Sequence, residues 1–318
     1  MRQTERTTLP SRVRVVEVGT RDGFQSERDW IATSDKISIL NALIDTGIPQ
    51  FEATSFVSPR AVPQLKDAAE LMAAVDRTTG AKLTALTPNE RGARDAVASG
   101  VDAIVLFVSA SESHNLKNMN ATRAQTLAGF KAVCAFADAA GTPVHGAIAT
   151  AFGCPFEGEI DVASVVEIAS AYRTLGITHL TLGDTTGMAT PPLVFERCAA
   201  LRKAVPDIEL SLHFHNTRGV GLANVYAGLQ AGVTTFESSV AGLGGCPFAP
   251  GATGNICTED LVYLLHECGI ETGIDLKKLR KVALHVEKVI GRKLPGQVMK
   301  AGPRLQTSAL DSVATAVG

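Results

Sequence analysis

Short β-branched and apolar runs alternate with longer segments of helical periodicity along most of the chain. Eight runs are expected to be strands, at residues 13–18, 50–54, 82–86, 103–108, 143–149, 179–182, 209–214 and 235–240. Amphipathic segments between them are expected to be helices, at residues 35–46, 63–75, 121–140, 162–175, 192–205 and 222–231. Helix-ending glycines stand before several of the strands, at positions 47, 100, 141, 176 and 232. Eight such units in under 300 residues favour a closed (β/α)8 (TIM) barrel over a doubly wound open sheet.

The rest of the chain suggests one domain with short ends. Residues 1–12 are expected to be a short flexible lead, and residues 13–294 a single barrel domain. Two further helices, at 258–268 and 276–290, belong to that domain and are expected to pack beneath or beside the barrel. Residues 295–318 contain small polar residues without a clear apolar face, so a mobile tail is expected there.

Charge and cysteine content narrow the class of protein. The 318 residues carry 30 Lys and Arg against 32 Asp and Glu, which argues against a nucleic-acid partner because binding phosphates needs a basic excess. No stretch reaches the ~18 apolar residues of a membrane span, so no membrane partner is expected. The six cysteines are scattered without CxxC pairs, which predicts reduced thiols and a cytoplasmic protein.

The seventh strand run carries two candidate metal ligands. In barrels of this kind the functional site forms at the carboxyl ends of the strands. Apolar residues in this run alternate with Ser211, His213 and His215, and the apolar set must face the surrounding helices. His213 and His215 should therefore project together into the barrel mouth, where two imidazoles can bind one metal ion.

Other polar residues follow the strand ends and could complete such a site. Asp22 is the obvious anionic third ligand, although it could simply pair with Arg21 in the same turn. Asn255 could supply a neutral oxygen from the loop after the eighth strand. Nitrogen and oxygen ligands with one carboxylate favour Mg²⁺ or Mn²⁺, with zinc as the alternative. Glu52 and Asp184 also lie at strand ends, where either could instead hold an arginine or a backbone amide.

A glycine-rich loop at 241–255 surrounds Cys246 and can approach a ligand closely or act as a lid. Cys246 is the one cysteine in such a setting. A buried structural role is expected for the three cysteines in helical segments, Cys134, Cys198 and Cys268. The sequence leaves the roles of Cys154 and Cys257 open.

Five segments together resemble the 3-hydroxy-3-methylglutaryl-CoA lyase family, which belongs to the metal-dependent barrels named for an Asp-Arg-Glu signature. They are 16–27 (VEVGTRDGFQSE), 54–59 (TSFVSP), 183–187 (GDTTG), 213–215 (HFH) and 241–247 (AGLGGCP). The resemblance runs from about residue 13 to residue 294. It implies cleavage of a 3-hydroxyacyl-CoA to acetyl-CoA and an oxo acid, as in leucine degradation and ketone-body formation, by a homodimer.

The resemblance also implies roles for matching residues. The divalent cation would be held by Asp22, His213, His215 and Asn255. Arg21 would stabilise the developing enolate, and Cys246 would protonate it as the loop closes. Glu52 and Asp184 would support the reaction, with removal of the hydroxyl proton shared among His213, Asp184 and metal-bound water. Substrate would also contact Gln25, Arg218 and Gly245.

The sequence departs from the family just after the two histidines. The lyases commonly read His-Asp-Thr-Tyr-Gly-Gln there, whereas His215 is followed by Asn216, Thr217 and Arg218. Arg218 could pair with Glu237 or with a phosphate of CoA, or select a more polar acyl group. The departure leaves two other readings open: the same chemistry on another substrate, such as citramalyl-CoA, or an aldol or condensing enzyme. A non-catalytic binding barrel ranks last.

Overall fold

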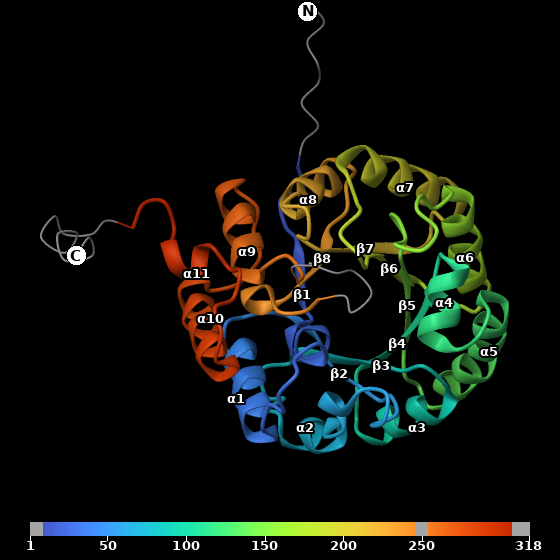
Figure 1. The fold of residues 1–318 in the computed structure, drawn as a ribbon, viewed down its shortest axis with the longest axis horizontal. Coiled ribbons are helices and arrows are strands. Elements are labelled where there is room, and N and C mark those ends of the chain that lie inside the picture. The colour runs from blue at the N-terminus through green and yellow to red at the C-terminus, as the bar shows by residue number, and fades with distance from the viewer. Residues whose placement is uncertain (1–8, 246–253, 307–318) are drawn as a thin grey trace, which may run out of the picture.

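The computed structural model describes residues 9–245 and 254–306. Eight parallel strands close into a barrel in which each strand pairs with the next in sequence and the eighth pairs with the first (Figure 1). The strands are β1 (Arg14–Glu17), β2 (Gln50–Ser55), β3 (Lys82–Leu86), β4 (Ala103–Ser109), β5 (Val144–Ala149), β6 (His179–Asp184), β7 (Glu209–Phe214) and β8 (Thr235–Ser238). The (β/α)8 barrel is confirmed, and every strand lies within two residues of its predicted ends.

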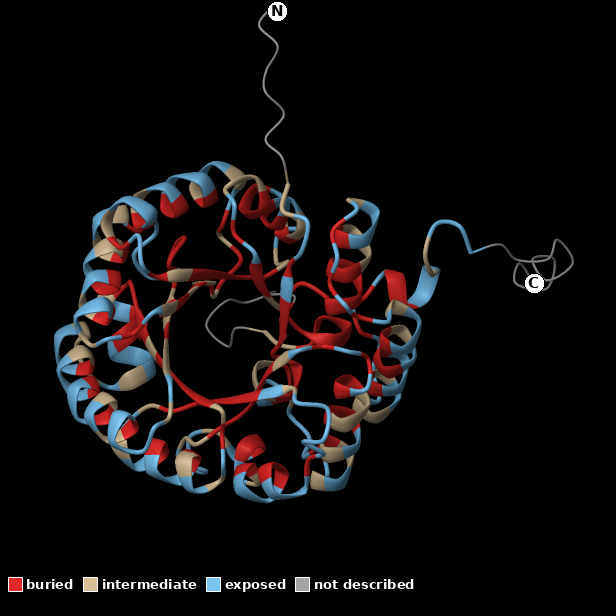
Figure 2. Ribbon diagram, turned by 180° about the vertical axis from the view of Figure 1, so that it is seen from behind, coloured by how far each residue is buried: buried red, intermediate tan, exposed pale blue. Residues whose placement is uncertain are grey.

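Helices surround the barrel and turn their buried sides toward it (Figure 2). They are α1 (Thr33–Ile44), α2 (Ala68–Ala74), α3 (Glu90–Ala98), α4 (Glu112–Met119), α5 (Arg123–Ala139), α6 (Val162–Thr174), α7 (Pro191–Ala204), α8 (Gly221–Gln230), α9 (Thr258–Glu267), α10 (Leu276–Ile290) and α11 (Val298–Ala301). Three short turns are η1 (Gly19–Gly23), η2 (Pro63–Leu65) and η3 (Val240–Gly242). All five glycines expected to end helices have positive φ, as that role requires.

The helix expected at 63–75 is broken in two, which corrects the prediction. The turn η2 ends at Leu65 and α2 begins at Ala68. The buried ammonium of Lys36 accounts for the break, because it donates hydrogen bonds to the Gln64 carbonyl and to the Asp67 carboxylate between the two pieces. The same ammonium lies 3.9 Å from the ring centroid of Trp30, which Lys66 also approaches at 4.4 Å.

The C-terminal helices lie beside the barrel. The helix α10 packs against α1 and α9, and α9 contacts β1. The expected tail from residue 295 is wrong at its start, because Val298 and Met299 of α11 are buried and Asp260 accepts hydrogen bonds from the backbone amides of Gln297 and Val298. In the predicted lead, Arg12 pairs with Glu271 through a parallel bridge. None of the helices described for residues 9–245 and 254–306 is long and apolar enough to span a membrane.

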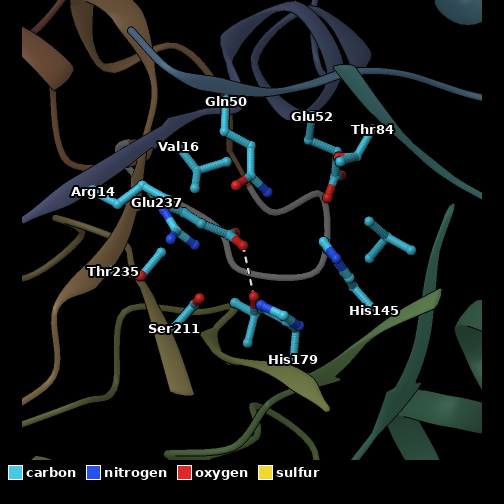
Figure 3. Close-up of a pocket in the computed structure, with 12 residues that line it drawn as sticks. Arg14, Val16, Gln50, Glu52, Thr84, His145, His179, Ser211, Thr235 and Glu237 are labelled. Carbon is cyan, nitrogen blue, oxygen red and sulfur yellow. Dashed lines mark hydrogen bonds between the residues drawn. The ribbon is translucent and has the colours of Figure 1, made fainter. Parts of the chain in front are cut away.

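The barrel interior beneath the mouth is filled with mostly polar side chains from all eight strands (Figure 3). The rings of His145 and His179 stack at 4.7 Å between centroids. The Nε2 atom of His179 lies 2.8 Å from the Glu209 carboxylate, which also pairs with Arg14. The free space is about 20 Å³, roughly enough for one water molecule. The interior below the mouth therefore has no room for a ligand much larger than a water molecule.

Candidate metal-binding active site

Asp22, His213 and His215 form a cluster whose potential ligand atoms all lie within 4.8 Å of one another. His213 lies near the end of β7, His215 follows that strand directly, and Asp22 lies in the turn η1 after β1. The Nε2 atoms of the two histidines are 3.1 Å apart, and Oδ2 of Asp22 is 4.0 Å from Nε2 of His215. The structure thus brings together these three residues, which the sequence places far apart.

Glu237 of β8 orients one of the histidines and was not assigned a site role in the sequence analysis. Its carboxylate lies 2.9 Å from Nδ1 of His213 and accepts a 2.7 Å hydrogen bond from Thr181. A carboxylate on Nδ1 places the ring proton there and leaves the Nε2 lone pair directed at the cluster. Burial lowers the pKa of His213, but Glu237 outweighs it and raises that pKa.

Asn255 joins the cluster through its backbone and its side chain. It pairs with His215 in an antiparallel bridge, and its Nδ2 donates a 2.7 Å hydrogen bond to Oδ2 of Asp22. Its Oδ1 is buried without a hydrogen-bond partner among the described residues. Two facing imidazole nitrogens, a carboxylate and an unpartnered amide oxygen are a donor set that suits a divalent cation. The four predicted ligands therefore fit such an ion.

Arg21 lies between two carboxylates. Its Nη1 is 2.6 Å from Oδ1 of Asp22, and its Nε contacts Oε1 of Glu52 on β2. Burial raises the pKa of Asp22, but Arg21 and the two histidines outweigh it and hold that pKa well below its usual range. Burial, partly offset by Arg21, raises the pKa of Glu52 to about 7. The ion pair anticipated in the turn is present, and it lies beside the metal cluster.

Asp184 at the end of β6 has one bonded and one open carboxylate oxygen. Its Oδ1 accepts hydrogen bonds from the backbone amides of Met188 and Ala189, at 2.6 and 2.9 Å. Its Oδ2 is buried and has no hydrogen-bond partner among the described residues. Burial outweighs the amide contacts and raises the pKa of Asp184 to about 7. A carboxyl with a pKa near neutrality can exchange a proton with substrate.

The glycine-rich loop approaches the cluster closely at Gly244. A Cβ there would lie 2.5 Å from Nδ2 of Asn255 and 3.3 Å from Oδ2 of Asp22, and the φ of +112° also favours glycine. Gly245 follows and is half-buried. Cys246 lies outside the described residues.

The two other residues expected to contact substrate, Arg218 and Gln25, are both exposed. Arg218 is exposed, and its Nη1 donates hydrogen bonds to the carbonyls of Thr186 and Gly187, at 3.0 and 2.7 Å. Since Glu237 is bonded to His213 and Thr181, the suggested pairing of Arg218 with Glu237 is wrong. Gln25 is exposed two residues beyond the end of η1.

Potential metal ligands beside a half-buried arginine, at the carboxyl ends of barrel strands, define a (β/α)8-barrel protein with an enzyme-like site. The chain belongs to the HMGL-like family, whose model matches residues 12–286. It is 44% identical to hydroxymethylglutaryl-CoA lyase, mitochondrial, of Gallus gallus over 297 residues, which are 93% of this chain and 100% of that protein. It is 42% identical to the Bacillus subtilis hydroxymethylglutaryl-CoA lyase over 91% of this chain and 96% of that one.

A solved structure has the same fold. It is an HMG-CoA lyase from Acinetobacter baumannii in complex with coenzyme A and 3-methylmalate, with a TM-score of 0.90 and 43% sequence identity. The match covers 94% of this chain and 98% of that chain.

Proposed function

We propose that the protein is a carbon–carbon lyase that cleaves 3-hydroxy-3-methylglutaryl-CoA to acetyl-CoA and acetoacetate. The main observation behind the proposal is that four potential metal ligands lie close together beside the ion pair of Arg21 and Glu52. These ligands are Asp22, His213, His215 and Asn255. Near full-length identity of 42–44% to hydroxymethylglutaryl-CoA lyases supports it. The complex of a relative with coenzyme A supports an acyl-CoA as the substrate.

The reaction removes the proton of the tertiary hydroxyl, breaks the bond to the carbon next to the thioester, and leaves an enolate that must gain a proton. A divalent cation, Mg²⁺ or Mn²⁺, would lower the pKa of the hydroxyl and orient the substrate. Asp184, with its open buried oxygen, is the best-placed proton acceptor, and His213 is the alternative. The guanidinium of Arg21 would stabilise the enolate in a site that excludes water.

Turnover of a panel of acyl-CoA thioesters with added Mg²⁺ or Mn²⁺ tests the proposed function. Release of acetyl-CoA and acetoacetate from 3-hydroxy-3-methylglutaryl-CoA is the expected result. Efficiency at least about tenfold higher on citramalyl-CoA, about 1.4 kcal/mol in transition-state binding, would assign the protein to that substrate instead. Aldol or condensing activity without cleavage of the carbon–carbon bond in an acyl-CoA would overturn the lyase assignment.

Cys246 is proposed to give the enolate its proton. The Cys246→Ser variant is expected to lose about 10²–10⁴-fold in kcat with a much smaller change in KM, because proton transfer contributes mainly in the transition state. Steady-state kinetics measure both constants. Cys134→Ser, in helix α5, is the control and should keep wild-type kinetics. Near wild-type turnover of Cys246→Ser would exclude the thiol as the proton donor.

Arg218 is proposed to act on substrate only through the loop that it holds. Because its guanidinium caps the carbonyls of Thr186 and Gly187, Arg218→Tyr should loosen the loop that follows Asp184. The expected result is a fall in kcat/KM of about tenfold or less, equal for 3-hydroxy-3-methylglutaryl-CoA and citramalyl-CoA. Parallel assays on the two thioesters measure the ratio, and a changed ratio would show that Arg218 selects the acyl group.

We also propose a homodimer in the cytoplasm. The dimer rests on the family resemblance, and sedimentation velocity would test it. The five cysteines in the described part of the chain are free thiols, which supports a reducing compartment.

A further inference from the structure

Glu17, the last residue of β1, is a fully buried carboxylate bonded to three separate segments of the chain. Its Oε1 accepts hydrogen bonds from the backbone amides of Gly19 and Val240, at 2.7 and 2.8 Å. Its Oε2 accepts a 2.6 Å hydrogen bond from the hydroxyl of Thr258. Burial of a carboxylate costs free energy because the charge loses its contact with water. Here burial raises the pKa of Glu17 to about 7, although the three hydrogen bonds lower that pKa.

Each of the three segments leads to a part of the candidate site. Gly19 begins the turn η1, which carries Arg21 and Asp22. Val240 begins η3, the turn that leads into the glycine-rich loop. Thr258 begins α9 and follows Asn255 by three residues. One side chain therefore joins the backbone around the arginine and around two of the four candidate ligands.

The two halves of the metal cluster are held by different means. His213 is part of β7, whose ladder to β6 and β8 fixes its backbone, and Glu237 fixes its ring. Asp22 belongs to no strand, and Asn255 lies outside the strands in an isolated bridge to His215. The Asp22 side of the cluster thus depends on contacts such as those that Glu17 makes.

A second carboxylate strengthens the same junction. Glu259, also fully buried, accepts a 3.0 Å hydrogen bond from the backbone amide of Ala241. Ala241 has a φ of +56°, a conformation that residues with a Cβ adopt at some cost. Adjacent amides in η3 are therefore bonded to two different buried carboxylates, which holds this turn in a conformation that its own sequence does not favour.

We propose that Glu17 is a positioning residue that sets the spacing of Asp22 and Asn255 from the two histidines and so determines the affinity for the metal ion. The inference deepens the proposed function, since it rests on the metal site assigned there. Glu17 touches none of the four ligands, so it acts through Gly19, Val240 and Thr258. Removal of its bond to Thr258 should weaken metal binding without unfolding the barrel, because the apolar core between the strands and the surrounding helices remains intact.

Mn²⁺ titration of the metal-free protein, by calorimetry or electron paramagnetic resonance, tests the proposal without relying on activity. Glu17→Gln keeps an oxygen for the two amides but loses the acceptor for Thr258. Thr258→Val removes the same bond from its other end, together with the 2.9 Å bond that Ser238 donates to the Thr258 hydroxyl. Each variant should bind Mn²⁺ about tenfold more weakly, as expected when an outer contact of a metal site is lost. Thr46→Val removes a buried hydroxyl bonded to Leu43 in α1, and this control should keep wild-type affinity.

The double variant separates positioning from general damage. Because both substitutions break the bond between Glu17 and Thr258, the loss of Mn²⁺ affinity in the double variant should be smaller than the sum of the two single losses. Fully additive losses, or wild-type affinity in a Thr258→Val protein that melts cooperatively, would overturn the proposal even if Glu17→Gln fails to fold. If the wild-type protein itself fails to bind Mn²⁺, the assigned metal site is wrong, and the proposed function falls with it.

Discussion

His213→Ala is expected to abolish measurable turnover, because it removes a ligand and leaves the half-buried Glu237 carboxylate without its imidazole partner. Mn²⁺ affinity should fall by at least about a hundredfold, since a lost ligand must cost more than a lost outer contact. Removal of metal ions from the wild-type protein with a chelator should have the same effect on turnover. Added Mg²⁺ or Mn²⁺ should restore activity to the wild-type protein but not to the His213→Ala variant. Calorimetry and the thioester assay measure the two quantities.

A histidine at the opposite end of the barrel supplies the matched control. His179 stacks on His145 and pairs with Glu209, far along the strands from the metal cluster. The His179→Ala variant should bind Mn²⁺ as the wild type does, even if it melts at a lower temperature. Full turnover of the wild-type enzyme in excess chelator would contradict a metal role for His213.

Replacement of Arg21 should have the second-largest effect. Arg21→Met is expected to lower kcat by about 10²–10³-fold, the usual loss when one donor that stabilises a developing anion is removed. Glu52 would then be left as a buried carboxyl beside Glu237 and should take up a proton, because its pKa is already about 7 with Arg21 present. The protein should still fold, since protonation removes the uncompensated charge.

Arg21→Lys distinguishes a need for positive charge from a need for the guanidinium shape. A lysine ammonium keeps the charge but cannot span Asp22 and Glu52 as the guanidinium does. An intermediate kcat is therefore expected, with Mn²⁺ binding retained. If Arg21→Met turned over substrate at the wild-type rate, Arg21 would serve only to neutralise its two neighbours.

Local patterns in the sequence were enough to predict the barrel and part of the site. The alternation in β7 predicted that His213 and His215 share the interior face, because successive side chains of a strand point to opposite sides. The position of Asp22 after a strand placed it at the same end of the barrel. Glu52 and Asp184 each have one of the two structural contacts considered for them. Glu52 contacts an arginine, and Asp184 accepts hydrogen bonds from backbone amides.

Features that depend on contacts between distant segments were missed. Glu237 could have been found, since it shares the inward face of β8 with Thr235, but nothing local indicates that its partner is His213. The break between η2 and α2 depends on the ammonium of Lys36, about 30 residues earlier in the chain. Arg218 lies near the mouth as expected, yet its bonds to two loop carbonyls follow only from the folded positions of β6 and β7.

The lysines that enclose Trp30 give the protein a built-in spectroscopic reporter. Trp30 is the one tryptophan in the sequence, and its side chain is 44% exposed. It lies seven residues beyond the turn that carries Arg21 and Asp22, and Lys36 ties it to the break before α2. Emission excited at the red edge of indole absorption therefore comes from this one place beside the barrel mouth. Changes in its intensity or wavelength can be read as local events there, without introducing a label.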